Sequence, residues 1–558
     1  MNDALATPSV DPQARPHGAL APAKVADRIA QTLAAYGVRF AFGIPGNDVL
    51  EIIGACEEQG IRFVLAKSEP SAAFMADAVY HLTGQPAALI PALGPGIANA
   101  ISGIASAAQE RSAMVVLTGE MATPQQGIYT HQVFDHVALA TPVTKYAATL
   151  NAARAAQQTA KALDIALAHP PGPVMLNIPA DVARAPSTEA RTFAPPRRSA
   201  PQLAEADAAR LRGMLAQARH PLTLIGRAAL QGGASEAVGT FLNAWSMPFL
   251  TTYKAKGIVS EHDALSLGAL GLSPVVDAEN LRLIADADLL VLIGFDPIEL
   301  RDAWLDAWDE AKPCISVDWV SANHRVFPLG EEALGDVPRI LTALAQSGRG
   351  GNEWPPERLA AHRSRVTSIV RPRAPKNAIS PAALFGAVSR RIAPDWLLTV
   401  DVGAHRILAN HVLHCLIPGQ LLQSNGLGHM GYALPSAIAA QLVHPTRTVV
   451  ALLGDGCLLM TTGDLALAAE LDLPIVVVVL NDDALSLIKL KQSKMQLEPR
   501  AVDFRSPRFD RVAEGFGAVG RRVTDLAAFE VALDKALAAR RFTVIDAVVD
   551  PAEYLEQM

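Results

Sequence analysis

Short runs of apolar residues alternate with amphipathic segments along most of the chain. In one unit, two such runs at Val449–Leu453 and Ile475–Leu480 flank an amphipathic segment at Gly463–Leu471. Runs this short and this uniformly apolar are typical of strands buried on both faces, and the segment between them suits a crossover helix. The pattern therefore predicts parallel strands joined by helices, which is the arrangement of an α/β fold.

The alternation recurs in three blocks and predicts three doubly wound parallel-sheet domains. A chain of 558 residues is too long for one core, which agrees with this division. We expect a flexible tail at 1–24, a Pro/Arg/Ser linker at 189–203 and a polar linker at Gln346–Lys376. The expected domains span 25–188, 204–345 and 377–552. Their expected strands are Val38–Phe42, Arg62–Ala66, Ala87–Ile90, Met114–Leu117 and Val174–Ile178, then Leu222–Ile225, Phe249–Thr252, Leu289–Ile293 and Cys314–Val317, and finally Leu397–Val400 with the two runs above.

Composition argues against several classes of protein. Half of the residues are apolar and 18% are charged, which suits large buried cores. A net charge of −7 without a basic stripe argues against nucleic acid as a partner. No apolar run approaches the roughly 20 residues of a membrane span, so no membrane association is expected. The four cysteines form no CxxC pair and are expected to be reduced core residues of a cytoplasmic protein: Cys56, Cys314, Cys415 and Cys457.

Acidic residues follow both strands of the unit at 449–480. Asp455 stands between Gly454 and Gly456, and Asp482 ends an Asn-Asp pair. Because neighbouring parallel strands end at the same edge of a sheet, the two carboxylates suit Mg²⁺, which takes its other ligands from water and phosphate. The glycines let a diphosphate approach the backbone closely. Gly-Asp-Gly alone is more often a plain turn, but a crossover that ends in Asn-Asp favours the metal site.

These residues resemble the thiamin-diphosphate motif, in which Gly-Asp-Gly is followed one crossover later by Asn-Asn or Asn-Asp. The resemblance implies that Asp455, the side chain of Asp482 and the backbone carbonyl of Ala484 hold Mg²⁺. It also implies that the three domains are a pyrimidine-binding, a middle Rossmann-like and a diphosphate-binding domain. Many relatives have Asn where this chain has Asp482, so the site here carries more negative charge.

Glu69 lies between a predicted strand and a helix expected at Ser71–Leu82, where it could simply cap the helix or face its dipole. Its context, SEPSAAFMADAVYHLTG, resembles the segment of thiamin enzymes whose Glu contacts the aminopyrimidine ring. The resemblance implies that Glu69 is catalytic and shares a proton with the ring nitrogen N1′, which requires a partly buried carboxylate. The ring can then remove the C2 proton, so that the cofactor becomes a nucleophile.

The resemblance implies further contacts with the cofactor. The stretch DVGAH after the strand at Leu397–Val400 implies that Ala404 and His405 meet the diphosphate. In SNGLGHMGYALPSAIAA, the carbonyl of Gly428 would accept from the 4′-amino group, and Met430 would be the apolar wedge under the two rings, although it could also be a core side chain. The implied cofactor-binding residues are Asn47, Ala404, His405, Gly428, Met430, Gly454, Gly456, Leu487 and Ile488.

Two stretches resemble one branch of the family, the FAD-independent catabolic acetolactate synthases, with carboxyethylarginine synthase nearby. They are THQ…D…AL…PVTKY within 130–146 and LIGFDPIEL at Leu292–Leu300. A lone His would more often be a surface residue, but in this branch the residues matching His131 and Gln132 face the reacting end of thiamin. The resemblance therefore implies that both are catalytic.

The middle domain carries weaker signals. No GxGxxG occurs in it and TTYKAKG at Thr251–Gly257 is not a phosphate loop, so FAD is unlikely as a cofactor. Lys254, Lys256 and Arg301 could reach an anionic substrate, although at least two of them are expected to face solvent.

The pocket implied by the resemblance favours carboligation. Pyruvate decarboxylases have a Glu where this chain has Ile488 and a His-His pair where it has His131-Gln132, and benzoylformate decarboxylases use a His that Ile90–Leu93 does not offer. Such an apolar pocket slows protonation after CO₂ leaves. We therefore expect an enzyme that decarboxylates a 2-oxo acid, with pyruvate favoured, and transfers the acyl unit to a second carbonyl compound. The alternatives are a non-oxidative 2-oxo acid decarboxylase of the benzoylformate or phenylpyruvate type, and a catalytically silent homologue.

The implied site is divided between domains. Glu69 lies in the first domain and Asp455 in the third, and in this family such surfaces come from two chains. The resemblance therefore implies a homodimer or homotetramer with active sites at the subunit interface.

Overall fold

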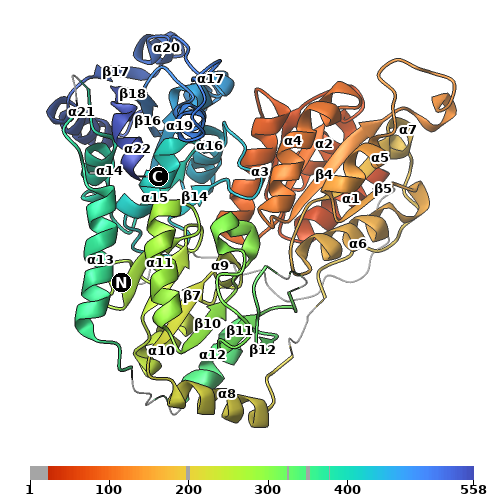
Figure 1. The fold of residues 1–558 in the computed structure, drawn as a ribbon. Helices are drawn as coiled ribbons and strands as arrows, with labels where there is room; N and C mark the ends of the chain where they lie inside the picture. The colour runs from red at the N-terminus through yellow and green to blue at the C-terminus, as the bar shows by residue number, and fades with distance from the viewer. Residues whose placement is uncertain are drawn as a thin grey trace.

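The structure, a computed structural model, describes residues 23–196, 201–322, 324, 326–346, 348, 352–375 and 378–557. Three six-stranded sheets, in which all the strand pairings are parallel, confirm the expected α/β fold of three domains. Figure 1 shows the N-terminal and C-terminal domains side by side above the middle domain. Nearly all of the expected tail, and residues 197–200 of the first expected linker, lie outside the described residues.

The N-terminal domain has the strand order β2-β1-β3-β4-β6-β5. Its inner strands match the expected apolar runs to within two or three residues at their ends, whereas the half-exposed edge strand β5 is an addition. Its strands are β1 Phe40–Ile44, β2 Arg62–Leu65, β3 Ala87–Pro91, β4 Met114–Glu120, β5 Tyr146–Thr149 and β6 Val174–Pro179, and its helices are α1 Val25–Ala35, α2 Leu50–Glu58, α3 Glu69–Thr83, α4 Pro95–Gln109, α5 His136–Ala140, α6 Ala155–Leu167 and α7 Ala180–Arg184.

The middle domain has the strand order β12-β11-β10-β7-β8-β9. The four inner strands match the expected apolar runs, whereas the two edge strands, β9 and β12, were not among the expected strands. Its strands are β7 Pro221–Ile225, β8 Phe249–Thr252, β9 Ser266–Leu270, β10 Leu289–Ile293, β11 Cys314–Asp318 and β12 Glu331–Leu334, and its helices are α8 Glu205–Gln217, α9 Arg227–Gln231, α10 Ser235–Trp245, α11 Pro274–Asp286 and α12 Val337–Ala345.

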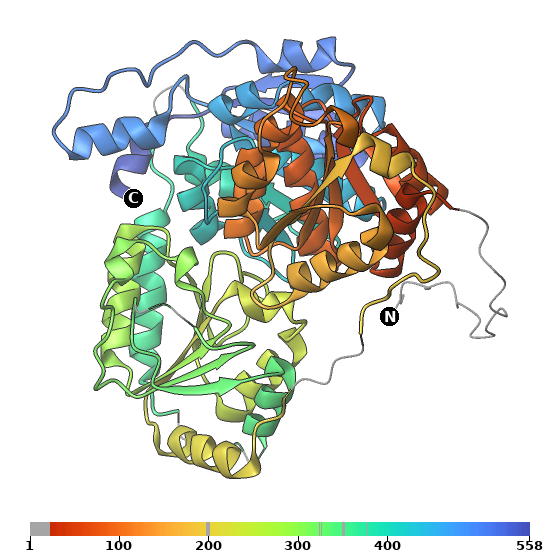
Figure 2. The ribbon, with the colours of Figure 1, turned by 90° about the vertical axis from the view of Figure 1, so that its right-hand side faces the viewer.

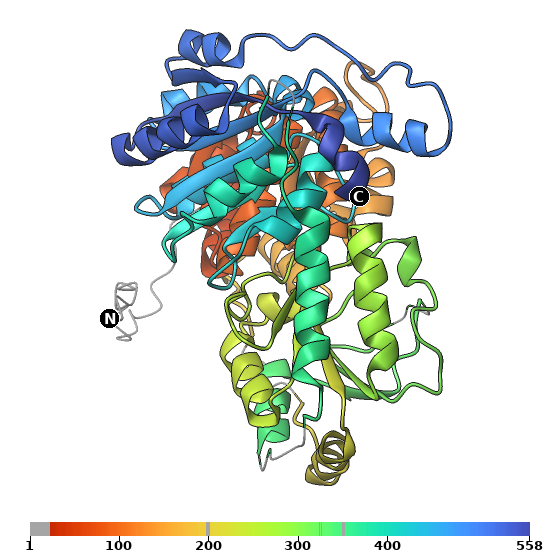
Figure 3. The same cartoon turned by 60° about the vertical axis from the view of Figure 1, so that its left-hand side comes forward.

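The expected linker at Gln346–Lys376 contains a helix, α13 Pro356–Val370, which the sequence did not predict. Polar residues dominate this helix, but it buries Leu359, His362 and Val370. It packs against α11 and β9 of the middle domain and reaches the C-terminal domain, as Figure 3 shows. Tertiary packing on a narrow apolar stripe therefore outweighs the polar composition of the segment.

The C-terminal domain has the strand order β14-β13-β15-β16-β18-β17. The expected unit at 449–480 is present, but its crossover holds two short helices, α17 and α18, and α17 begins at the Asp of Gly-Asp-Gly. Its strands are β13 Trp396–Val400, β14 Leu421–Gln423, β15 Thr448–Gly454, β16 Val476–Asn481, β17 Val519–Val523 and β18 Thr543–Val548, and its helices are α14 Pro381–Ser389, α15 Ala404–Val412, α16 Ala433–Val443, α17 Asp455–Met460, α18 Asp464–Glu470, α19 Ser486–Lys494, α20 Phe509–Gly515, α21 Leu526–Ala539 and α22 Tyr554–Gln557.

The N-terminal and C-terminal domains share one hydrophobic core. Helix α3 lies between α4 and α16, and its small residues Ala72, Ala73 and Ala76 are fully buried there. The approach is close, because a Cβ at Gly103 of α4 would lie 2.5 Å from the Cβ of Ala73. In Figure 2 the N-terminal domain lies in front of the C-terminal domain. The packing of α3 against α16 fixes its position relative to the C-terminal domain.

Two findings bear on the expectations from composition. All four cysteines are buried and free, as expected. Within the part of the chain that the structure describes, none of the helices combines the length and the apolar character that a membrane crossing requires.

Candidate active site

A cavity of about 230 Å³ lies at the carboxyl ends of β13, β15 and β16. These strands are neighbours in the sheet, so the loops that follow them meet at one edge. Sequence segments almost ninety residues apart thereby share one wall. The implied residues that line this cavity are Ala404, His405, Gly428, Met430, Gly454, Asp455, Gly456, Asp482, Ala484, Leu487 and Ile488.

Asp455 and Asp482 form an acidic pair on this wall. Asp455 is 2% exposed, and its Oδ2 accepts hydrogen bonds from the backbone N–H of Asp483 at 2.8 Å and from Ser506 Oγ at 3.0 Å. Asp482 Oδ2 accepts from Ser486 Oγ at 2.7 Å. Burial raises the pKa of Asp455, and burial together with the charge of Asp455 raises the pKa of Asp482 to about 7. The cavity therefore holds two acids whose charges repel each other.

The donor set of this pair fits Mg²⁺. None of the described residues on the cavity wall is a Lys or Arg, and burial lowers the pKa of His405 to about 3, which keeps it neutral. The other oxygen of Asp455, Oδ1, accepts from the backbone N–H of Gly456 at 2.7 Å and keeps acceptor capacity. No group of three metal-binding side chains gathers among the described residues. A cation here would take two carboxylates, the carbonyl of Ala484, and phosphate or water.

Replacing Asp482 with Asn should raise the melting temperature of the metal-free protein. The change removes one of two like charges from a poorly solvated site and retains an oxygen that can accept from Ser486 Oγ. We expect a gain of about 1 kcal/mol at pH 8, where the carboxyl group is otherwise ionised. Thermal unfolding in the presence of EDTA measures it, and a lower melting temperature would contradict the repulsion.

The wall next to the acids suits the diphosphate. His405 lies in the first turn of α15 and is 6% exposed, and its Nε2 has no hydrogen-bond partner. A Cβ at Gly454 would approach the His405 ring to 3.2 Å, so a larger residue there would press on the imidazole. In the Nε2–H tautomer of the neutral ring, this unpartnered nitrogen beside the N-terminus of a nine-residue helix can donate to a phosphate oxygen.

The loop between β14 and α16 supplies another part of the cavity wall, including Gly428 and Met430. Gly428 has a φ of 66°, which favours glycine, and the Met430 Cε would lie 3.4 Å from a Cβ at Gly456. Buried Asp401 fixes the end of the loop, because its carboxylate accepts from the backbone N–H of Gly431 and of Ala433, both at 2.9 Å. Met430 therefore has a defined position in the cavity and is not an interior core residue.

Apolar residues form the rest of the wall. They are Leu480, Leu485, Leu487 and Ile488, from the end of β16 to the first turn of α19. Tyr554 of α22 also lines the cavity, and burial, followed by the charge of Asp482, raises the pKa of its hydroxyl well above the usual value. Tyr554 is not among the implied residues, because it lies beyond the expected end of the domain at 552 and belongs to no motif.

Glu69 lies outside this cavity. It is the first residue of α3, two residues before the expected start of the helix, and Ser68 caps the helix by accepting from the backbone N–H of Ser71. Glu69 as a whole residue is 9% exposed. Its Oε2 accepts a hydrogen bond from Asn99 Nδ2 of α4 at 2.5 Å. Asn99 was also missed, because it stands in a helix without a recognisable motif.

The other implied residues of the N-terminal domain lie in loops at the carboxyl ends of its strands. Asn47 follows β1 and is exposed, and His131 and Gln132 lie in the exposed loop after β4. Gln132 lies against the turn after β3, because a Cβ at Gly94 would come within 2.7 Å of its carbonyl oxygen. None of these residues lines the cavity of the same chain. The chain thus presents two separate clusters of implied residues, one at the strand ends of each outer domain.

The expectation that at least two of Lys254, Lys256 and Arg301 face solvent is wrong, because only Arg301 is exposed. Lys256 is 2% exposed and pairs with Glu261 at 2.5 Å, and Lys254 is 8% exposed and pairs with Glu110. The acidic partner of Lys254 is 144 residues away in the sequence, so composition around the lysine could not reveal it.

Comparison with known protein families identifies the three domains. The chain matches the thiamine pyrophosphate enzyme N-terminal TPP binding domain over residues 23–139, the central domain over 208–344 and the C-terminal TPP binding domain over 401–547. The last range holds nearly all of the cavity wall, and the first holds Glu69.

Curated relatives cover almost the whole chain. It is 31% identical over 526 residues to the catabolic acetolactate synthase of Raoultella terrigena, with 92% of each chain covered. It is 29% identical to the acetolactate synthase of Bacillus subtilis, with 94% of this chain and 93% of the relative covered. It is 30% identical to the probable 2-ketoarginine decarboxylase AruI of Pseudomonas aeruginosa, with 89% of each covered. With all three domains present and relatives of this similarity along its length, the chain belongs to the thiamine pyrophosphate enzyme family and is similar to the acetolactate synthases.

Proposed function

We propose that the protein is a Mg²⁺- and thiamin-diphosphate-dependent carboligase that decarboxylates a 2-oxo acid, with pyruvate favoured, and joins the acyl unit to a second carbonyl compound. The cofactor, when bound, supplies the nucleophilic carbon that takes up the 2-oxo acid and retains the acyl unit after CO₂ leaves. The residues of this chain bind that cofactor, hold its reacting end and control access of protons.

Binding is assigned to one end of the cavity. Asp455, Asp482 and the carbonyl of Ala484 hold Mg²⁺, and the metal neutralises both the acidic pair and the diphosphate. His405 donates to the diphosphate through its unpartnered Nε2. Met430 and Gly428 would hold the two rings of the cofactor, and the apolar residues Leu485, Leu487 and Ile488 line the same cavity.

The composition of that wall is the observation that carries the proposal for carboligation. Leu485, Leu487 and Ile488 offer no acid or base, and the titratable groups among the described lining residues cluster around the metal and diphosphate end or are a buried Cys and Tyr. Because this wall supplies no proton donor of its own, protonation to an aldehyde is slowed there, and a second carbonyl compound can react instead. Similarity to two acetolactate synthases supports the same conclusion.

A non-oxidative 2-oxo acid decarboxylase is the second candidate. It is favoured by the similarity to the probable 2-ketoarginine decarboxylase AruI, which is of the same order as the similarity to the synthases. In this case the apolar wall would receive the side chain of a larger substrate, and a proton would come from solvent or from a residue of a partner chain.

The two separate clusters support a homodimer, or a homotetramer of two such dimers, as the active assembly. The cavity of one chain would receive Glu69, His131 and Gln132 from its partner, because these residues lie outside the cavity of their own chain. The buried Glu69 carboxylate, hydrogen-bonded by Asn99, would then meet the pyrimidine ring.

Product analysis separates the candidates. With pyruvate, Mg²⁺ and thiamin diphosphate, we expect one CO₂ for every two pyruvates consumed and acetolactate as the carbon product. Free acetaldehyde in equal amount to CO₂ would favour the decarboxylase. Cofactor binding without CO₂ release from a panel of 2-oxo acids, 5-guanidino-2-oxopentanoate included, would indicate a catalytically silent homologue.

A further inference from the structure

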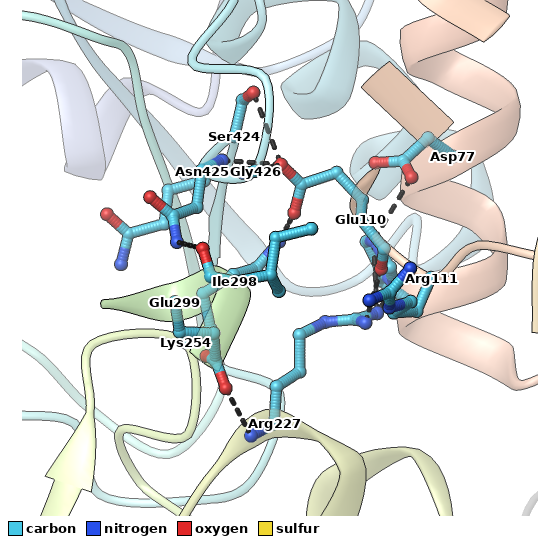
Figure 4. Close-up of polar contacts among 12 residues, drawn as sticks. Asp77, Glu110, Arg111, Arg227, Lys254, Ile298, Glu299, Ser424, Asn425 and Gly426 are labelled. Atoms are coloured by element: carbon cyan, nitrogen blue, oxygen red, sulfur yellow. Dashed lines mark hydrogen bonds and ion pairs between the residues drawn. The ribbon is translucent and has the colours of Figure 1, made fainter. Parts of the chain in front are cut away.

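A buried polar cluster, which we call the junction cluster, lies where the three domains meet (Figure 4). It consists of Glu110 from the end of α4, Lys254 and Arg227 from the middle domain, and the backbone of Ser424–Gly426 from the C-terminal domain. Glu110, Lys254 and Arg227 are 2%, 8% and 8% exposed. None of the three lines the cofactor cavity.

Glu110 is bound to the start of the loop that leads into the cavity. Its Oε1 accepts from the backbone N–H of Asn425 at 2.5 Å, from that of Gly426 at 3.0 Å and from Ser424 Oγ at 3.4 Å. Hydrogen bonds from backbone N–H groups to a carboxylate are charge-assisted and strong, particularly away from water. The N-terminal domain thereby holds three successive residues of the C-terminal domain.

The middle domain supplies the opposite charge. Lys254 Nζ contacts the second carboxylate oxygen of Glu110, and Arg227 donates to the Glu110 backbone carbonyl. A buried carboxylate without such a partner would be costly, and removal of one member of a buried pair leaves the other uncompensated. Lys254 therefore makes it possible for Glu110 to hold the loop in its ionised form.

The loop between this anchor and α16 is short and carries cavity residues. Gly428 and Met430 follow Gly426 by two and four residues, and Asp401 fixes the end of the loop at Gly431. At the anchor the fit is tight, because a Cβ at Gly426 would lie 2.6 Å from the Cβ and 2.7 Å from the carbonyl oxygen of Gln109. A displacement at the anchor would therefore be transmitted to Met430 in the cavity.

We propose that Glu110 and Lys254 are positioning residues that hold the loop 424–430 in the geometry needed to bind thiamin diphosphate. The inference rests on the proposed cofactor site at Gly428 and Met430. It assigns to the middle domain, which contributes no residue to the cavity wall, a part in cofactor binding that acts through Lys254.

The chain contains a matched control for this proposal. Lys256 and Glu261 form a second buried ion pair only two residues further on, and Glu261 accepts from the backbone N–H of Cys415 at 2.6 Å. This pair also joins the middle domain to the C-terminal domain but has no contact with the loop. Lys256→Met should therefore lower the melting temperature without lowering the affinity for thiamin diphosphate.

The test compares the affinity of the full-length protein for thiamin diphosphate, measured by calorimetry at saturating Mg²⁺, with its melting temperature. We expect Glu110→Ala and Lys254→Met each to weaken binding on the order of tenfold. Glu110→Gln combined with Lys254→Met should recover most of the affinity, because the Gln oxygen can still accept from Asn425 and Gly426 and the Glu110 charge is removed together with its counter-ion.

Gly426→Ala tests the connection between the anchor and the cavity without removing a charge. It should also lower the affinity for thiamin diphosphate, because the added Cβ would push the loop away from Gln109. The proposal is overturned if the Glu110 and Lys254 variants bind the cofactor as the wild type does, or if Lys256→Met weakens binding equally. It is also overturned if the single variants do not fold while the double variant and Gly426→Ala fold and bind normally. A wild-type protein that binds no thiamin diphosphate would instead contradict the proposed function.

Discussion

Glu69→Gln should slow hydrogen–deuterium exchange at C2 of bound thiamin diphosphate by about 10²- to 10⁴-fold, which is the usual contribution of a positioned acid or base. The substitution keeps the size of the side chain and an oxygen that can accept from Asn99 Nδ2, so the fold at the start of α3 should be retained. What is lost is the ability to share a proton with the pyrimidine ring. Affinity for the cofactor and Mg²⁺ should change little, and quenched-flow NMR of the C2 proton measures the rate.

Glu470→Gln is a suitable control for this experiment. Glu470 is an exposed acid that forms an ion pair with Lys67 at 2.7 Å. Lys67 lies two residues before Glu69 in the sequence. Its replacement changes the net charge by the same amount and should leave the exchange rate at the wild-type value. If Glu69→Gln exchanges as fast as this control, Glu69 does not activate the cofactor and its assignment is wrong.

Asp455→Asn should abolish Mg²⁺-dependent binding of thiamin diphosphate, with an affinity at least about 100-fold lower than that of the wild type. Asp455 is both a proposed metal ligand and the acceptor for the backbone N–H groups of Asp482 and Asp483, so an amide removes charge from the metal and weakens the support of the second ligand. Calorimetry with the cofactor at fixed Mg²⁺ measures the loss.

Asp483→Asn gives the matched comparison for Asp455→Asn. Asp483 lies next to Asp482 in the same turn but is exposed and faces away from the cavity, with its Oδ1 accepting from the backbone N–H of Ser506. Its φ of 57° is one that Asn tolerates. If Asp483→Asn binds the cofactor almost as the wild type does while Asp455→Asn loses affinity, then Asp455 acts as a metal ligand and not merely as a nearby negative charge. Equal losses would indicate a general electrostatic effect and would contradict the assignment.

The sequence predicts the inner parts of this fold well, for a physical reason. Strands such as β10 and β15 are buried on both faces and must be apolar throughout, so their limits can be read from the chain. Edge strands such as β5 and β12 are partly exposed and have mixed composition. The polar composition of helix α13 predicts no helix, because only a narrow stripe of it is buried.

The residues of the proposed cofactor cavity could be predicted from the sequence more readily than the residues that support them. Asp455 and Asp482 lie in a short motif whose spacing follows from a single crossover, and the structure places both on the same cavity wall. Tyr554, Asn99 and Lys254 reach their partners through the tertiary fold, and no local pattern marks them. Pairs separated by more than a hundred residues in sequence, such as Glu110 and Lys254, become visible only when the domains are assembled.

The junction cluster also limits how this protein can be shortened or recombined. The middle domain contributes nothing to the cavity wall. Its removal would nevertheless leave the buried Glu110 carboxylate without its counter-ion Lys254. Exchange of middle domains between relatives would meet the same obstacle unless the incoming domain brings a cation to the position of Lys254. The three domains therefore have to be kept together, although only the two outer domains carry the proposed site residues.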